Sequence, residues 1–251
     1  MKLRLLVLCI IAFVSMPALA QEKADEPALR SLFAVELMEA RAGGTSVLGA
    51  TLTEVTTPPE IPGYALNMIA HFEGWFPQKY DDPAGYCTIG FGRLFAKKTC
   101  ASLTEAEIKA HVTMDEWANG ISEERGLELL SEDLLIARRF VGKVVTVETS
   151  ADQFGSLVSF AFNVGGGNLQ RSTLLSKTNK KDFSGAQREF ARWVRAGGTV
   201  LRGLQIRRSC EAMLFSGALS KRKSEEFSRL ECQSFGATSD VSALVDIETG
   251  E

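Results

Sequence analysis

The chain has 251 residues, of which 45% are hydrophobic and 24% charged, as in an ordinary globular protein with a sizeable core. This composition excludes a fibre, a repeat array and wholesale disorder. The 31 acidic residues outnumber the 28 basic ones and give a formal net charge of −3. This average charge does not favour a strongly basic surface, and we expect no nucleic-acid partner.

Residues 1–20 have the pattern of a secretory signal peptide. Lys2 and Arg4 give a positive start, an almost wholly apolar run follows, and Ala18-Leu19-Ala20 is a small-x-small ending. The apolar run is shorter than the about 20 residues that a transmembrane helix needs. We predict cleavage after Ala20, a periplasmic or secreted protein and no stable membrane anchor; an uncleaved anchor that later releases is the alternative. Cleavage removes two basic residues and no acidic ones, so 26 basic and 31 acidic residues remain and the net charge becomes −5.

Residues 21–60 carry scattered charges, a Gly43-Gly44-Thr45-Ser46 break and the run Thr56-Thr57-Pro58-Pro59. We predict a mostly flexible leader with one short helix from Ser31 to Arg41, where the periodic apolar face is brief.

Residues 61–92 predict a helix, a turn and a strand that fold back on one another. One apolar helical face leads up to Glu73, and Gly74 ends the helix. Asp82-Pro83-Ala84-Gly85 has turn chemistry, and Cys87-Thr88-Ile89 are strand formers. This hairpin-like arrangement is expected to aim Glu73, Asp82 and Thr88 into one cleft.

The next segments are mainly helical. A capping box at Thr104 predicts one helix start, and an apolar stripe predicts a helix from Ser122 to Val141. A second capping box at Ser150 opens a run to Val164 that is apolar almost all round, which is typical of a buried central helix. Gly165-Gly166-Gly167 is expected to end it.

From Ser172 onward we predict further helices, with breaks near Gly197-Gly198, Gly203 and Gly217. Residues 218–251 are expected to form a C-terminal helix and a disordered tail that begins near Ser234, because no periodic apolar face follows.

Four cysteines remain after removal of the signal, which contains Cys9; they are Cys87, Cys100, Cys210 and Cys232. In an oxidising compartment they can form two disulfides, and the sequence leaves three pairings open. The short separation favours Cys87 with Cys100, and Cys210 with Cys232 then follows by elimination. Metal binding is the alternative, but no CxxC spacing supports it, and we expect no metal and no cofactor.

Six arginines gather late in the chain: Arg188, Arg192, Arg195, Arg202, Arg207 and Arg208. One interpretation is a basic patch that attracts an anionic polymer. The other is a solvated helix face that pairs with neighbouring acids.

Two carboxylates in one cleft are the minimum equipment for breaking a glycosidic bond. One gives a proton to the leaving oxygen, and the other stays ionised to activate water or to stabilise developing positive charge. The aromatic neighbours of Glu73 favour the acid role, whereas Asp82 lies among polar groups and backbone N–H donors and is expected to stay ionised.

The segments Glu73-Gly74, Tyr80-Asp81-Asp82, Ala84-Gly85 and Thr88-Ile89-Gly90-Phe91-Gly92 resemble the active-site signature of phage-type lysozymes, the glycoside hydrolase family 24 muramidases and endolysins. Leu157 to Gly165 is similar to the central helix of that family, and Phe190-Ala191-Arg192-Trp193 and Arg207-Arg208 match later segments. The resemblance covers roughly residues 61–217.

This resemblance implies an α+β, mainly α, lysozyme-like fold, with a small β-hairpin lobe and a helical lobe around a central buried helix. It implies a monomeric muramidase that cleaves the β-1,4 bond between N-acetylmuramic acid and N-acetylglucosamine in peptidoglycan glycan strands. Glu73 is then the general acid, Asp82 positions or activates water rather than its neighbour Asp81, and Thr88 assists. The residues implied to line the saccharide cleft are Leu94, Phe162, Asn163 and Ser172, although the last two can instead serve as helix caps and the first two as core residues.

The sequence departs from the family in three places. Arg93 stands where most members have His, so we expect Arg93 to make the ion pair usually made by that His. An insertion of about residues 95–119 separates the hairpin from the next helix and can cap the cleft. The leader and the C-terminal extension are also additional.

Two other functions fit the same residues. One is a catalytically silent peptidoglycan-binding module of the same fold. The other is an inactive partner that binds another protein through the insertion.

Overall fold

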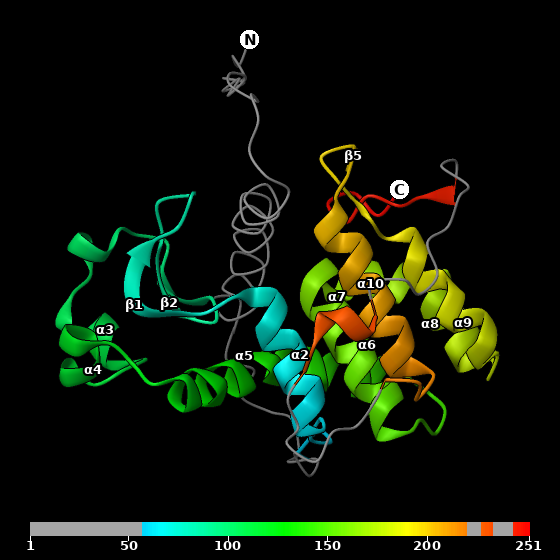
Figure 1. Cartoon of the computed structure of the whole chain (residues 1–251). Helices are drawn as coiled ribbons and strands as arrows, with labels where there is room; N and C mark the ends of the chain where they lie inside the picture. The colour runs from blue at the N-terminus through cyan, green and yellow to red at the C-terminus, as the bar shows by residue number, and fades with distance from the viewer. Residues whose placement is uncertain (1–56, 220–226, 233–242) are drawn as a thin grey trace, which may run out of the picture.

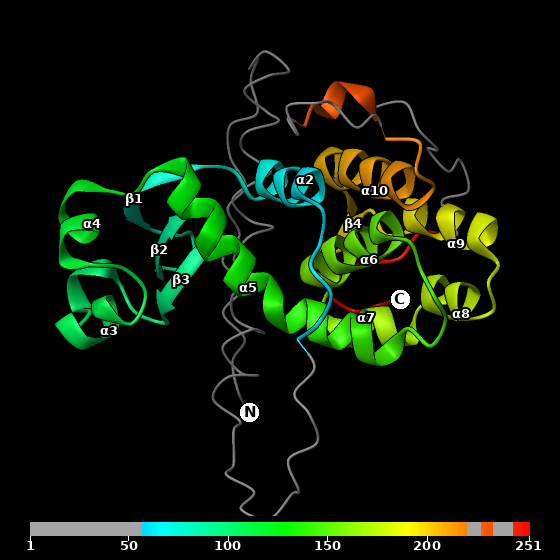
Figure 2. The same cartoon turned by 90° about the horizontal axis from the view of Figure 1, so that it is seen from below.

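The computed structural model describes residues 57–219, 227–232 and 243–251, and it forms two lobes. The small lobe holds a β-sheet and short helices, and the larger lobe is helical (Figure 1). The long helix α5 (Glu123–Val144) runs from one lobe into the other, and α2 (Gly63–Glu73) lies beside the helical lobe and leads into the sheet (Figure 2). The predicted α+β, mainly helical architecture, with a small β lobe and a helical lobe, is confirmed. The predicted signal peptide and nearly all of the leader lie outside the described residues.

The end of the leader is held against α5. The Arg138 guanidinium donates to the carbonyl oxygens of Pro58 and Pro59, both at 2.9 Å, and pairs with Glu60 at 2.6 Å. The folded domain therefore begins a few residues before the predicted boundary at residue 61. Within the described ranges, no helix combines the length and the apolar character needed to span a membrane.

The small lobe is built on an antiparallel sheet with strand order β1-β2-β3. Its strands are β1 (Phe76–Asp81), β2 (Cys87–Gly90) and β3 (Arg93–Ala96). The predicted helix, turn and strand are confirmed, since α2 ends at Glu73 and Gly74 has a φ of 68° that few other residues adopt. The turn after β1 carries the chain into β2, where Tyr80 pairs with Thr88.

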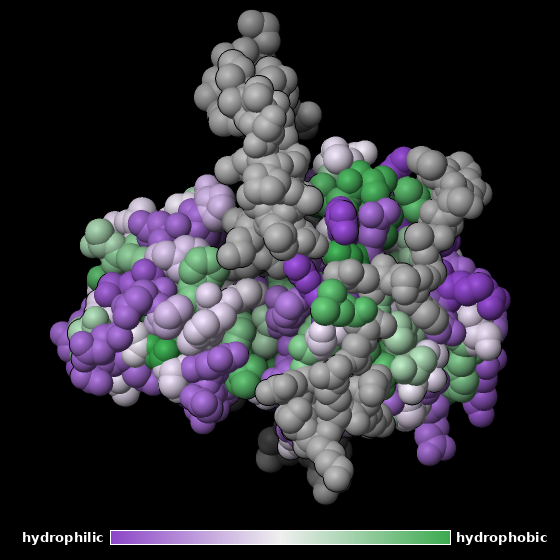
Figure 3. Space-filling model, viewed as in Figure 1, coloured by the Kyte–Doolittle hydropathy of each residue, from purple (hydrophilic) through white to green (hydrophobic). Residues whose placement is uncertain are grey.

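The insertion packs beside this sheet as a 3-10 turn and two short helices. They are η1 (Cys100–Ser102), α3 (Glu105–Lys109) and α4 (Met114–Asn119). The expected capping box at Thr104 is present, and Thr113 makes a second one. The insertion is tied to β1, because the Lys79 ammonium donates to the Trp117 carbonyl oxygen at 2.7 Å and lies 4.6 Å from its ring centre. On the face shown in Figure 3 this lobe presents many hydrophilic residues.

Trp75 joins the small lobe to the long helix. Its ring packs against Phe91 with 4.8 Å between centroids, and it lies so close to α5 that a Cβ at Gly126 would stand 2.2 Å from it. Only glycine fits at that position without moving the helix from the sheet.

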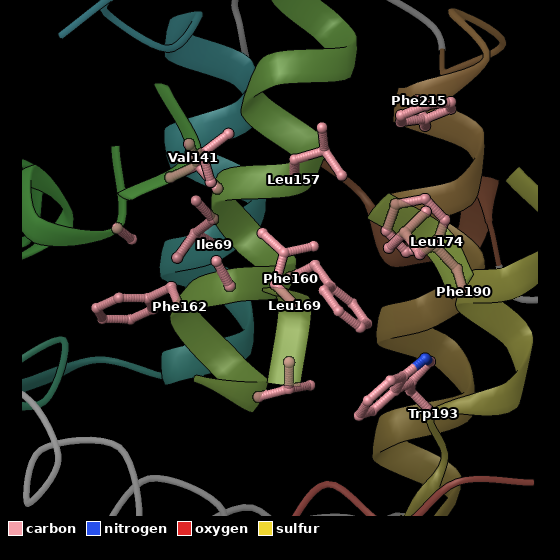
Figure 4. Close-up of a cluster of buried hydrophobic side chains, with 14 of the residues drawn as sticks. Ile69, Val141, Leu157, Phe160, Phe162, Leu169, Leu174, Phe190, Trp193 and Phe215 are labelled. Carbon is pink, nitrogen blue, oxygen red and sulfur yellow. The ribbon is translucent and has the colours of Figure 1, made fainter. Parts of the chain in front are cut away.

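The helical lobe surrounds α6 (Ala151–Val164), as predicted from its all-round apolar character. Phe160 is fully buried and makes edge contacts with Phe190 and Trp193, at 5.5 and 5.3 Å between centroids. Figure 4 shows it pointing from α6 toward these two rings, whereas Phe162 points away from them. Full burial of such a ring contributes about 1.5–3 kcal/mol. Around α6 stand α7 (Gly166–Arg171), α8 (Thr173–Asn179), α9 (Phe183–Glu189), the turn η2 (Phe190–Arg192) and α10 (Arg202–Phe215).

Two of the predicted helix breaks are wrong in detail. Gly165 ends α6 with a φ of 87°, but Gly166 already begins α7. Gly203 does not break a helix, since it lies in the first turn of α10, where helices tolerate glycine. The preceding residues are not helical: β4 (Arg195–Ala196) and β5 (Thr199–Val200) form a hairpin around Gly197 and Gly198.

The predicted disordered tail is wrong for residues 243–251. Arg195 exchanges backbone hydrogen bonds with Val245 and Ile247, whose side chains are buried, and Asn168 donates to the Ile247 carbonyl oxygen at 2.8 Å. This end of the chain lies near the β5 end of the helical lobe in Figure 1. The predicted C-terminal helix appears only as one 3-10 turn, η3 (Arg229–Glu231), in the described part of the extension.

Both predicted disulfides are present. Cys87 pairs with Cys100 across 13 residues and fastens the insertion to β2. Cys210 pairs with Cys232 across 22 residues and fastens η3 to α10. There Phe227 contacts the rings of His71 and Phe72, at 5.3 and 6.0 Å between centroids, so the extension covers part of α2.

Candidate active site

Glu73 lies at the C-terminal end of α2, where the chain leaves the helix for β1. Its side chain is only 10% exposed, and its Oε1 accepts a hydrogen bond of 2.8 Å from Nη1 of Arg207 on α10. The sequence suggested apolar surroundings for this carboxylate, but the structure places a guanidinium against it. Trp75 and Phe76 pack elsewhere, on Phe91 and Tyr80.

Arg207 connects Glu73 to a second buried carboxylate. Its Nε donates to Oε1 of Glu211 at 3.2 Å, and its guanidinium lies 5.5 Å from the centre of the Phe72 ring. Burial lowers the pKa of Arg207, but the charges of Glu73 and Glu211 outweigh it and leave that pKa raised. Arg207 is therefore a permanent cation in the wall behind Glu73.

Glu211 is the centre of this buried network. It is fully buried and accepts hydrogen bonds from the Ser159 hydroxyl at 2.7 Å and from Nη1 of Arg208. Arg208 also donates to Oδ1 of Asn163 and to the Trp193 carbonyl oxygen, the latter at 3.0 Å. Burial lowers the pKa of Arg208 to about 10, against the opposing charge of Glu211. Two arginines and two glutamates thus link α2, α6 and α10.

Asp82 and Thr88 both make hydrogen bonds to the backbone of Tyr86. Oδ1 of Asp82 accepts the N–H groups of Ala84 and Tyr86, at 2.9 and 2.8 Å, so the carboxylate sits among backbone donors as predicted. The Thr88 hydroxyl donates to the Tyr86 carbonyl oxygen at 3.1 Å. Backbone hydrogen bonds of the turn therefore hold both side chains at the same end of the hairpin.

Asp81 has a different use. Its Oδ1 accepts the Cys100 backbone N–H at 2.6 Å, next to the disulfide that holds the insertion. Asp81 therefore helps to attach the insertion to β1.

The structure places the four residues expected to line a saccharide cleft in different surroundings. Leu94 is buried on β3 opposite Thr88, and Phe162 is buried in the core formed by α6. Asn163 is half-buried and bound to Arg208. Ser172 is the N-cap of α8: its hydroxyl accepts the Leu175 N–H at 3.0 Å and donates to the Leu169 carbonyl oxygen at 2.7 Å. The capping alternative therefore applies to Ser172, and no cap is made by Asn163.

Arg93 makes ion pairs with two carboxylates of α5. It is buried, with Nε 3.1 Å from a carboxylate oxygen of Asp133 and Nη2 2.7 Å from Oε2 of Glu132. These contacts attach β3 to α5.

Neither surface interpretation of the late arginines, a basic patch or a solvated helix face, holds for Arg207 and Arg208. Both are buried in the network behind Glu73, because each has a carboxylate partner one helical turn away. The Arg207 and Glu211 spacing of four residues was the available signal for this pairing. Arg188 and Arg202 are exposed, and Arg192 pairs with Glu189 at 2.9 Å.

Among the described residues, the one group of possible metal ligands consists of Asp81, Cys87 and Cys100. Its two sulfur atoms form a disulfide, so they are not thiolates able to bind a metal.

Comparisons with known proteins give a consistent result. The family model described as phage lysozyme matches residues 70–211. A SAR-endolysin of Bacteriophage PS119 is 32% identical over 192 residues, which are 75% of this chain and 94% of that protein. An endolysin of Bacillus phage B103 is 35% identical over 166 residues, which are 65% of this chain and 57% of that longer protein.

Two solved structures with similar folds are a muramidase domain and an endolysin. The muramidase domain of SpmX from Asticaccaulis excentricus has a TM-score of 0.51 and 28% identity, covering 62% of this chain and 97% of that one. The endolysin from Escherichia coli O157:H7 phage FAHEc1 has a TM-score of 0.51 and 26% identity, covering 62% and 93%.

Proposed function

This chain belongs to the phage lysozyme family, and on that premise we propose that it cleaves peptidoglycan with Glu73, Asp82 and Thr88 as its reacting groups. It is a glycoside hydrolase of the lysozyme type. Its substrate is the β-1,4 bond between N-acetylmuramic acid and N-acetylglucosamine in the glycan strand. The observation that carries this assignment is the α2–β1–β2 unit, which presents Glu73 at its helix end and holds Asp82 and Thr88 on the backbone of one residue, Tyr86.

Glu73 acts as the general acid. The hydrogen bond from Arg207 uses Oε1, which leaves Oε2 to carry the proton that goes to the glycosidic oxygen. As the bond between the anomeric carbon and that oxygen breaks, the proton neutralises the leaving alkoxide. Arg207 then faces the carboxylate that remains.

Asp82 and Thr88 supply the water. Oδ1 of Asp82 is occupied by two N–H donors, so Oδ2 is the oxygen that takes a proton from water as the new bond to the anomeric carbon forms. The Thr88 hydroxyl donates its hydrogen bond to the Tyr86 carbonyl oxygen, so its lone pairs can accept a hydrogen bond from that water. Attack by a water held in this way inverts the anomeric configuration.

The protein is exported to the cell-wall side of the membrane, where this substrate lies. Two disulfides support that location, because they form and persist in oxidising compartments. In this proposal the N-terminal segment acts as a signal peptide cut after Ala20, and the mature protein acts as a monomer on glycan strands.

Turbidity clearing of purified cell walls tests the assignment. We expect Glu73→Gln and Asp82→Asn to abolish lysis, while the matched neighbour variant Asp81→Asn remains lytic because its carboxylate only holds the Cys100 N–H. Undiminished lysis by Glu73→Gln would refute the assignment. Wall binding by the unaltered protein, without release of reducing ends, would support the silent binding module instead.

A further inference from the structure

We propose that Glu211 is a positioning residue of the reaction, which fixes Arg207 against Glu73 and sets the pH above which Glu73 stops working as the acid. This inference rests on the proposed role of Glu73. It concerns a residue that touches neither substrate nor the reacting atoms, and it acts through the buried charges that the fold assembles behind the site.

The position of the Arg207 guanidinium is fixed by its hydrogen-bond partners. Its guanidinium is held at one edge by Glu211 and at the other by Glu73, with Nη2 also 3.5 Å from the Ser159 carbonyl oxygen. Because Arg207 and Glu211 stand four residues apart on α10, the helix itself fixes their geometry. Glu211 therefore decides where the Arg207 charge stands relative to Glu73.

The second step is that Glu211 is itself immobile. It is fully buried, and four groups fix it: the Ser159 hydroxyl, Arg207 and Arg208 bind its carboxylate, while the Ser156 hydroxyl donates to its backbone carbonyl oxygen at 2.7 Å. A buried charge with this many partners is costly to build and strongly destabilising to break. Such a site holds one geometry through the catalytic cycle.

The third step is the charge balance. When Glu73 is ionised, the two arginines and two glutamates of the network cancel. When Glu73 carries its proton, one positive charge remains, and the Glu211 charge limits how strongly the arginines oppose that state. Removal of the Glu211 charge favours the ionised form of Glu73, and removal of the Arg208 charge favours the protonated form.

Other charged groups of the elements packed against α2, α6 and α10 lie elsewhere on their helices or pair with one another. His71 of α2 contacts Phe227 and feels the charge of Arg229 in η3, and Asp152 lies at the opposite end of α6 from Asn163. Glu189 of α9 pairs with charges on α8 and η2. Those pairs are Lys177 with Glu189 and Arg192 with Glu189. The charged partner in contact with Glu73 is therefore Arg207, and those in contact with Glu211 are Arg207 and Arg208.

The pH profile of wall lysis tests the proposal. With Glu211→Gln, which keeps the shape and removes the charge, we expect the alkaline limb to move to lower pH by roughly one unit, which is about tenfold in rate at a fixed pH on that limb. With Arg208→Gln we expect the limb to move the opposite way. The opposed directions keep the test decisive if one variant does not fold.

Ser156→Ala is the matched control, since it loosens the same contact between α6 and α10 without changing a charge. We expect it to lower the melting temperature and to leave the alkaline limb in place. An unmoved limb in Glu211→Gln, or shifts of one sign in both charge variants, would overturn the proposal. If Glu73→Gln is inactive and the alkaline limb of Glu211→Gln is unmoved, only this inference fails. If Glu73→Gln remains active, the proposed function fails.

Discussion

Arg207→Met is expected to cost the protein about 3–5 kcal/mol of unfolding free energy at neutral pH. The replacement keeps the length of the side chain but leaves the buried Glu73 and Glu211 without their shared cation. The native Arg207 side chain is only 5% exposed, so water cannot replace it. For a domain of this size, that loss lowers the melting temperature by roughly 6–20 °C.

Thermal and urea unfolding at neutral pH measure this loss. Arg202→Met is the matched control, because Arg202 begins the same helix but is exposed, and it should change the stability by no more than about 0.5 kcal/mol. A second test is a double-mutant cycle with Glu73→Gln, in which the loss from Arg207→Met should shrink. If Arg207→Met costs less than about 1 kcal/mol, the value of a surface ion pair, the buried network is not what joins α2 to α10.

Three further outcomes follow from the same contacts. Replacing Cys210 and Cys232 by serine should lower the unfolding free energy by about 3 kcal/mol, since 22 residues separate them, and unaltered urea unfolding would contradict a structural role. Ile247→Ala should lower the unfolding free energy by about 2–4 kcal/mol because the side chain is buried. Val200→Ala, at an exposed site of the adjoining hairpin, should be nearly neutral. Equal losses in the two variants would show that residues 243–251 do not pack as described. Burial, with the charge of Arg229, lowers the pKa of His71, so the His71 contribution to stability should be full above about pH 6.5 and decline as the pH falls below it. His71→Gln should lack that decline. A stability curve of His71→Gln that runs parallel to that of the unaltered protein would exclude His71 as its source.

The α2–β1–β2 unit could be predicted from the sequence because each of its parts has a local cause. Gly74 stops α2, the Asp82 turn has its own hydrogen-bond acceptors, and β-branched residues follow it in β2. The capping boxes at Thr104 and Ser150 are local for the same reason. Such signals depend on residues three or four positions apart, which a sequence displays directly.

The network behind Glu73 could not be predicted in the same way. Arg207 is 134 residues from Glu73 in the chain, and its burial depends on how α2, α6 and α10 pack. A run of arginines on a helix is more often solvated, which explains why the sequence favoured a surface position for Arg207 and Arg208. The aromatic residues around Glu73 misled for a related reason: adjacent side chains need not face the same neighbour.

The docking of the C-terminal end was also hidden. Val245 and Ile247 are too few to give a periodic pattern, and their backbone partners are only Arg192 of η2 and Arg195 of β4. The β4–β5 hairpin has strands of two residues each, which fall below the length at which alternation is visible.

The most direct test of the central claim is mass spectrometry of the fragments released from purified peptidoglycan. Hydrolysis by water between N-acetylmuramic acid and N-acetylglucosamine should give fragments that end in reducing N-acetylmuramic acid, and Glu73→Gln should release none. Fragments that end in reducing N-acetylglucosamine, or in an anhydro sugar formed without water, would contradict the assignment of Glu73, Asp82 and Thr88 to a muramidase.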